Sequence, residues 1–156
     1  MPANVSQTVV DYLQASVSLH LTAIENYHSQ SMFYARWGYS KLAERYKADA
    51  KEERGHLSQV VTRLEFYDVP MSFAHDSPSW PRHDFEAALQ ANYELEMKAA
   101  GVERAAILAC RESGDELTAL VFAGLLQGSE ASIADIEGIQ RVIEEIGLDN
   151  YLANQV

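Results

Sequence analysis

The chain is poor in the residues that interrupt or crosslink a fold: among 156 residues there are one cysteine, four prolines and eight glycines. The single cysteine, Cys110, excludes an intramolecular disulfide and a zinc site built from cysteines. Proline and glycine are scarce inside the long segments, which disfavours a turn-rich β fold and favours long helices. We therefore expect one all-α domain spanning residues 1–156 with one substantial core.

Basic side chains are also few, with 12 lysines and arginines against 23 aspartates and glutamates, for a net charge of -11. Non-specific binding to nucleic acid needs a basic surface, so we expect no nucleic-acid partner. No basic start is followed by an apolar run, which predicts no signal peptide. No apolar run approaches the roughly 18 residues that span a membrane. These features predict a cytoplasmic protein without a membrane partner.

Apolar residues recur at helical spacing in four long segments, which predicts helices over residues 4–37, 40–67, 83–111 and 116–146. The segment 68–82 contains three prolines and no helical pattern. A connection of about 15 residues is too long for a turn between neighbouring helices, so it predicts a crossover to a parallel helix. A short break at 113–115 makes the fourth helix an antiparallel neighbour of the third. The tail, 148–156, predicts a short fifth helix.

Metal-binding side chains lie on the apolar faces of three segments. Glu53 and His56 are three residues apart and share the inward face of the second segment. Burying them costs several kcal/mol unless they are paired or bind a metal. His20 lies on the inward face of the first segment, and Glu96 on that of the third, whose apolar stripe also includes Glu103. These positions favour a metal site, and a hydrogen-bonded polar network without metal is the alternative.

Several stretches together carry a resemblance to a known family. They are Val10-Asp11-Tyr12-Leu13, Ala23-Ile24-Glu25-Asn26-Tyr27, Trp37-Gly38, Glu53-Arg54-Gly55-His56, Leu95-Glu96 and Ile146-Gly147-Leu148-Asp149-Asn150-Tyr151-Leu152. With these residues the sequence resembles bacterioferritin over nearly its whole length. The resemblance implies a ferritin-like four-helix bundle and a hollow cage of about two dozen subunits. It also implies oxidation of ferrous iron at a di-iron site and storage of ferric mineral.

The resemblance also implies a set of ligands, and this chain departs from it. The family's site takes a glutamate from the first helix, Glu-x-x-His from the second, a glutamate from the third and Glu-x-x-His from the fourth. The second and third helices here supply Glu53, His56 and Glu96, and Tyr27 is expected beside these ligands. The first-helix glutamate position holds His20. The fourth-helix positions hold Ser129 and Ser132, which are weak neutral donors.

These departures predict a site for one metal ion. His20, Glu53 and His56 form a set of two histidines and one carboxylate, which suits Fe(II) or Zn(II), and Glu96 is expected to complete it. The family's haem-binding methionine position holds Arg54, whose guanidinium does not ligate haem iron, so haem is not expected there.

Three functions remain open from the sequence. The favoured one is an iron-storage cage subunit with a modified metal site and weak or lost ferroxidase activity. This subunit would assemble alone or together with an active paralogue. The second is a mononuclear non-haem metal oxidase on a ferritin-like bundle. The third is a metal-free structural subunit of a mixed cage.

Overall fold

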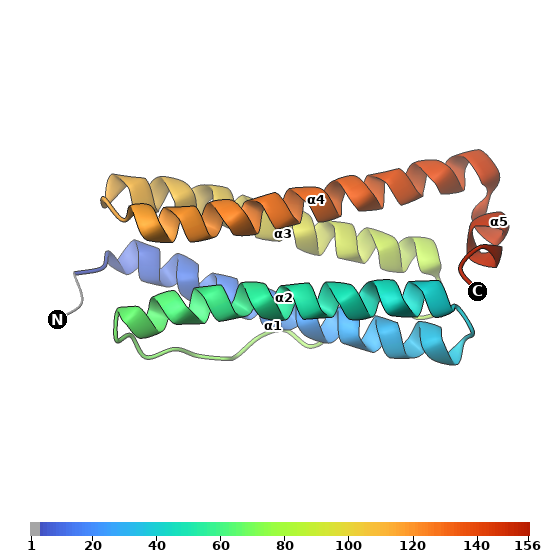
Figure 1. Cartoon of the computed structure of the whole chain (residues 1–156), viewed down its shortest axis with the longest axis horizontal. Coiled ribbons are helices and arrows are strands. Elements are labelled where there is room, and N and C mark those ends of the chain that lie inside the picture. The colour runs from blue at the N-terminus through green and yellow to red at the C-terminus, as the bar shows by residue number, and fades with distance from the viewer. Residues whose placement is uncertain (1–3) are drawn as a thin grey trace.

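The computed structural model describes residues 4–156, and within that range every regular element is a helix (Figure 1). In chain order the helices are α1 (Gln7–Arg36), α2 (Ser40–Phe66), α3 (Phe85–Glu112), α4 (Glu116–Ile146) and α5 (Leu148–Ala153). The all-α class and the short C-terminal helix are therefore confirmed. The expected bounds of the fourth helix are those of α4, and the other long helices differ from expectation by one to three residues at their ends.

The four long helices form two antiparallel pairs, α1 with α2 and α3 with α4, which pack on each other as a bundle (Figure 1). Gly38 closes the α1–α2 turn at a φ of 86°, and Gly114 closes the α3–α4 turn at 76°. Only glycine adopts such angles without a steric cost. Helices α2 and α3 run in the same direction, which confirms the predicted crossover between them (Figure 1).

The crossover, residues 67–84, runs back along α1 (Figure 1). Gln14 of α1 donates to the Ser72 carbonyl at 2.5 Å and accepts from the Ser72 amide at 2.9 Å. Further along, the Asn26 side chain accepts a hydrogen bond from the Ser79 amide at 3.2 Å. These side chains satisfy backbone groups that an irregular segment leaves unpaired. They fix the crossover to the bundle, and with it the parallel order of α2 and α3.

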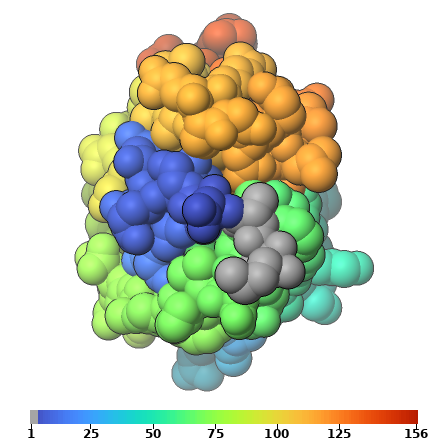
Figure 2. All heavy atoms as spheres, turned by 90° about the vertical axis from the view of Figure 1, so that its left-hand side faces the viewer, coloured from blue at the N-terminus to red at the C-terminus, as the bar shows by residue number. Residues whose placement is uncertain are grey.

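Helix α4 begins at an aspartate that also ties two helices together. The Asp115 carboxylate caps α4 by accepting from the Thr118 amide at 3.1 Å. The same carboxylate accepts a hydrogen bond from the Tyr67 hydroxyl and lies 3.5 Å from a guanidinium nitrogen of Arg63. The end of α2 is thereby joined to the start of α4 at the end of the bundle that faces the viewer in Figure 2.

Within residues 4–156, α4 is the one helix that is long and apolar enough, by length and composition, to cross a membrane. This criterion averages hydropathy along the helix, and α4 contains no uninterrupted apolar run of that length, because Gln127, Ser129 and Glu130 interrupt it. The core helix of a soluble protein meets the same criterion, and α4 buries Phe122 and Leu125 in the bundle. Its apolar character also comes from Leu117 and Leu120, which are 65% and 66% exposed in the first turns of the helix, orange in Figure 2.

The apolar core consists of two clusters. One includes Tyr27, Tyr34, Leu42, Tyr46, Leu89, Ile136 and Ile139. The other includes Val9, Leu13, Val17, Val60, Leu64, Phe122 and Leu125. The two clusters take different stretches of each long helix, so each occupies its own part of the bundle's length. A stretch of every long helix is left between them.

Candidate metal centre

Polar side chains fill the layer between the two apolar clusters. Every long helix contributes to it: His20 from α1, Glu53 and His56 from α2, Glu96 and Glu103 from α3, and Ser129 and Ser132 from α4. The periodicity that turns apolar residues inward on each helix turns these residues inward as well. Buried groups of this kind destabilise the fold unless they find partners. The layer is therefore where a bound ion has most to contribute.

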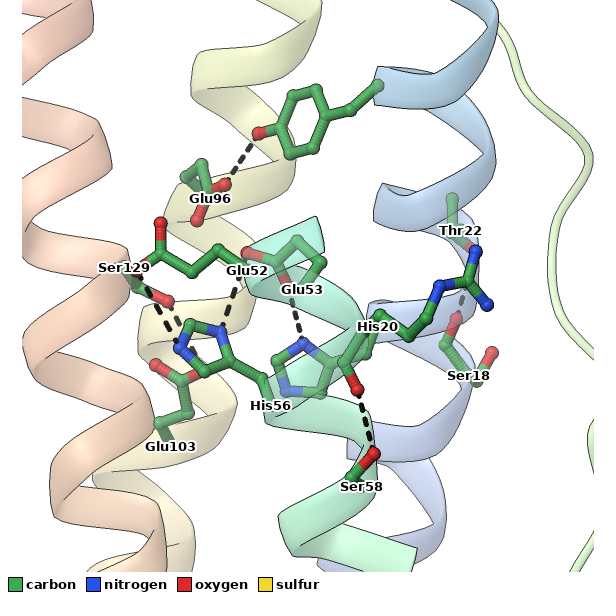
Figure 3. Close-up of polar contacts among 12 residues, drawn as sticks. Ser18, His20, Thr22, Glu52, Glu53, His56, Ser58, Glu96, Glu103 and Ser129 are labelled. Carbon is green, nitrogen blue, oxygen red and sulfur yellow. Dashed lines mark hydrogen bonds and ion pairs between the residues drawn. The ribbon is translucent and has the colours of Figure 1, made fainter. Parts of the chain in front are cut away.

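His20, Glu53 and His56 meet in this layer (Figure 3). His20 Nδ1 lies 2.6 Å from Glu53 Oε2, and His56 Nδ1 lies 3.7 Å from Glu53 Oε1. One ligand atom from each side chain can be chosen so that all three lie within 4.8 Å of one another. The structure therefore brings together three of the four residues predicted as ligands, and we call them the triad.

The Glu53 carboxylate is held in its ionised form. Burial raises its pKa, but the hydrogen bond with His20 and the imidazole of His56 outweigh burial and lower the pKa to about 2. The pKa of His56 is raised, chiefly by its interaction with Glu53 and against the effect of burial. An ionised carboxylate between two imidazoles presents one negative charge and two nitrogen donors to a cation.

The imidazole of His56 packs directly against the backbone of α4. A Cβ atom on Gly128 would lie 2.9 Å from His56 Cε1, closer than non-bonded carbon atoms approach. Glycine at this position therefore lets α4 come close to the triad. The same imidazole also approaches Glu52, with 3.9 Å between His56 Nε2 and Glu52 Oε1.

Glu96 is buried but lies apart from the triad. Its Oε1 accepts a 2.5 Å hydrogen bond from the Tyr27 hydroxyl. The group of ligand atoms within 4.8 Å of one another does not include Glu96. Burial and the nearby Glu53 charge raise the pKa of Glu96 to about 8, although the Tyr27 hydrogen bond lowers it. At neutral pH this carboxyl group is therefore largely protonated.

The two serines of α4 differ in their surroundings. Ser129 is buried, and its hydroxyl donates to Glu103 Oε1 at 3.2 Å. Ser132 is half-buried and lines a cavity of about 20 Å³ together with Tyr27 and Asp49. A cavity of that size holds about one water molecule. Neither serine therefore brings a charged donor to the polar layer.

Glu103 belongs to the same layer and was not among the predicted ligands. It follows Glu96 by seven residues, two helical turns, so both face inward from α3. Its side chain is 2% exposed, and burial raises its pKa to about 7. The sequence signal was present, because a glutamate on an apolar stripe is uncommon without a partner. What the sequence lacks is the distance from this carboxylate to the residues of the other helices.

Arg54, the residue at the predicted haem position, lies away from the polar layer. Its side chain is exposed on α2, and its carbonyl oxygen accepts a hydrogen bond from the Ser58 hydroxyl at 3.0 Å. A guanidinium has five N–H donors and no lone pair for iron. The absence of haem binding at Arg54 therefore stays a prediction, which rests on the chemistry of the side chain.

The triad offers the donors for one divalent ion. Two imidazoles and one carboxylate form a set that binds Fe(II) or Zn(II). A second ion beside the triad would meet the hydroxyls of Ser129 and Ser132, which do not offset its charge. Glu96, the carboxylate nearest to such a second position in the family pattern, is engaged by Tyr27.

Comparison with known proteins agrees with the fold. Residues 10–146 match the ferritin-like domain family. The chain is 29% identical to the bacterial ferritin of Neisseria meningitidis serogroup B over 152 residues, which covers 97% of this chain and 98% of that protein. It is 28% identical to the bacterioferritin of Mycobacterium avium, with 95% and 93% covered. The bacterial ferritin of Pseudomonas aeruginosa is 27% identical, with 95% and 96% covered.

Proposed function

Because the chain belongs to the ferritin-like family, we propose that it is an iron-binding subunit that holds one divalent ion at His20, Glu53 and His56. Membership of the family and the similarity to bacterioferritins support iron storage, with iron as the cargo. The observation that carries the proposal is the triad itself, whose ligand atoms lie within 4.8 Å of one another in the middle of the bundle. Iron is the expected metal, and zinc is the competing one.

The proposal of one ion rests on what the fourth helix contributes. Two divalent ions a few ångströms apart repel each other strongly unless carboxylates bridge them. Glu53 is the one carboxylate of the triad, and α4 offers Ser129 and Ser132 instead of a glutamate and a histidine. The residues present therefore support a modified, mononuclear site.

A mononuclear site changes the oxidation of iron that the resemblance implies. A pair of ferrous ions supplies two electrons to dioxygen at once, whereas a single ferrous ion supplies one. Reduction of dioxygen by one electron is the harder step, so we expect slow ferroxidase activity from this chain alone. In a mixed cage this subunit would then bind iron, and an active paralogue would carry out the rapid oxidation of ferrous iron.

Assembly into a closed oligomer is part of the proposal. The similarity to bacterioferritins supports a hollow homo-oligomer of about two dozen subunits, alone or mixed with a paralogue. Three leucines near the α3–α4 turn are 62% to 66% exposed, namely Leu108, Leu117 and Leu120. Apolar side chains gathered at one end of a bundle are typical of surfaces that a neighbouring subunit covers.

The metal-free structural reading is the second candidate, and one contact favours it. The 2.6 Å bond between His20 Nδ1 and Glu53 Oε2 gives each side chain a partner without any ion. A metal oxidase acting on an organic substrate is less well supported. The cavity that Tyr27 and Ser132 line beside the polar layer holds about 20 Å³, which is about one water and far from the volume of an organic substrate.

Metal content per subunit tests the proposal. The purified protein is loaded with Fe(II) without oxygen, or with Zn(II), desalted and analysed for metal. We expect one ion per subunit in the wild type and none in the variant His56→Gln. The matched control is His75→Gln, because His75 lies in the crossover, paired with Glu25 at 3.1 Å, and should leave the content unchanged. Two ions per subunit would show a dinuclear site, and none in the wild type would favour the structural reading.

A further inference from the structure

One oxygen of the polar layer has no partner. Among residues 4–156, Glu103 Oε2 is buried and makes no hydrogen bond, while Oε1 of the same carboxylate accepts from Ser129. The whole residue is 2% exposed, so water does not readily satisfy this oxygen. A buried acceptor without a donor costs about 1–3 kcal/mol. A buried group left in this state is a candidate ligand for a cation.

The unpartnered carboxylate lies beside the triad. Figure 3 shows Glu103 next to His56, with Ser129 close to both. The charge of Glu103 raises the pKa of His56, and the charge of His56 lowers that of Glu103, so the two groups are close enough for their charges to interact. The bond from Ser129 fixes one oxygen of the carboxylate on the α4 side and leaves the other free. Glu103 is therefore the carboxylate of α3 that approaches the His56 side of the triad.

We propose that Glu103 supplies the fourth protein ligand of the metal site, through its free oxygen Oε2, and that Ser129 positions this carboxylate. The proposal rests on the proposed function, because it needs an ion at the triad. Glu103 is not among the ligand atoms that already lie within 4.8 Å of one another, so a side-chain rotation brings it to the ion. A carboxylate from α3 would then take the place left vacant by Ser129 of α4.

The charge balance of the layer supports this assignment. With Glu53 alone, a divalent ion leaves one positive charge uncompensated in the core. With Glu53 and Glu103 both ionised, two negative charges match one divalent ion. The arrangement thus explains how a chain without fourth-helix ligands keeps a neutral site.

Glu96 is the competing source of a second carboxylate. Both glutamates are buried on α3, but their partners differ. The Tyr27 hydroxyl occupies Glu96 Oε1 at 2.5 Å, and Tyr27 is itself packed in the apolar cluster of that half of the bundle. Glu103 instead meets the small side chain of Ser129, and one of its two carboxylate oxygens has no hydrogen-bond partner.

The variants Glu103→Gln and Glu96→Gln form a matched pair, since each replaces a buried carboxyl group of α3 by an amide of the same shape. Zn(II) affinity is measured by competition with a chromophoric chelator, and coordination by the visible absorption of the Co(II) form. We expect Glu103→Gln to weaken Zn(II) binding about tenfold or more and to alter the Co(II) spectrum. Glu96→Gln should stay within about twofold of the wild type and keep its spectrum.

The outcomes separate the two proposals. Zn(II) bound equally well by wild type and Glu103→Gln, but lost in His56→Gln, would overturn the role of Glu103 and leave the triad standing. Equal binding by all three proteins would overturn the triad itself. Thermal unfolding of each metal-free variant shows whether it folds. Anomalous diffraction from Zn(II)-soaked crystals of the wild type gives a direct answer, with a Glu103 oxygen expected about 2.0–2.2 Å from the ion.

Discussion

Ser129 of α4 and Glu103 of α3 face each other on adjacent helices, and the serine hydroxyl donates a 3.2 Å hydrogen bond to the glutamate. Position 129 is where the resemblance to bacterioferritin implies a glutamate. The polar layer of this chain therefore has a buried carboxylate in that region, but one that comes from the neighbouring helix.

Restoring the missing ligands should restore the second ion. In the variant Ser129→Glu with Ser132→His, the fourth helix regains a Glu-x-x-His pair on its inward face. The substitution Glu103→Gln is added so that two carboxylates do not repel each other at the same place. We expect two Zn(II) or Fe(II) ions per subunit in this triple variant, measured by elemental analysis. Ser132→His alone is the control and should stay at one ion.

Gly128→Ala should displace His56. The new Cβ would lie 2.9 Å from His56 Cε1, so the imidazole must move away from its place beside Glu53. We expect Zn(II) affinity to fall about tenfold or more, measured by chelator competition. Gly124→Ala, one helical turn earlier, meets no atom within 4 Å, so it should keep the affinity and stabilise the helix by about 0.5–1 kcal/mol. Equal affinities of the two variants would show that the close approach of α4 does not matter.

The stability of the metal-free protein should fall as pH rises through the range of Glu96. Its pKa is about 8 in the folded protein, against about 4.3 for an unperturbed carboxyl group. Between these values the folded state binds more protons than the unfolded state, so the free energy of unfolding decreases with rising pH. Urea titrations of Glu96→Gln should show a flatter dependence from pH 5 to pH 8. Glu94→Gln, at an exposed site on the same helix, should follow the wild type.

Asp115 should contribute more to stability than another aspartate that caps a helix. Asp84 caps α3 by accepting from the Ala87 amide, and asparagine caps a helix equally well, so Asp84→Asn should be nearly neutral. Asp115 also accepts from Tyr67 and pairs with Arg63. We expect Asp115→Asn to cost about 1–3 kcal/mol at pH 7, measured by urea unfolding. An equal effect of both substitutions would contradict a role for the contacts with α2.

This contribution of Asp115 has a defined pH dependence. Burial alone would raise its pKa, but the hydrogen bonds from Tyr67 and Thr118 and the charge of Arg63 lower it below the usual value. A depressed carboxyl pKa stabilises the fold above the unfolded pKa of about 3.9, and the contribution is lost as pH falls through the folded value. Wild type and Asp115→Asn should therefore converge in stability at the most acidic pH at which both remain folded.

The helices and the crossover could be predicted from the sequence because both depend on local pattern. Apolar spacing gives the long helices, and the prolines of 68–82 exclude a helix there. The predicted and observed bounds of α4 agree because Gly114 and Gly147, both at positive φ, interrupt the helical backbone close to its two ends. That Glu53 and His56 lie on the same face of α2 could also be predicted, because residues three apart on a helix share a face regardless of how the helix packs.

The rest of the site depends on how the helices are placed against one another. Whether Glu96 or Glu103 meets His56 is decided by the relative height of α3 and α2, and two turns of helix separate the two glutamates, about 10 Å along the axis. Nothing within α3 fixes that height. The close approach of Gly128 to His56 likewise depends on how α2 and α4, which are far apart in the sequence, pack against each other.

All three residues of the triad belong to the α1–α2 hairpin, and His20 lies only 33 residues before Glu53. In terms of contact order the triad is thus a local arrangement, formed when a single turn at Gly38 closes. During synthesis the N-terminal half of a chain leaves the ribosome first, so these ligands are complete before α3 and α4 exist. In the proposed site, the first hairpin therefore supplies the first three ligands, and the later helices supply the second carboxylate and enclose the ion.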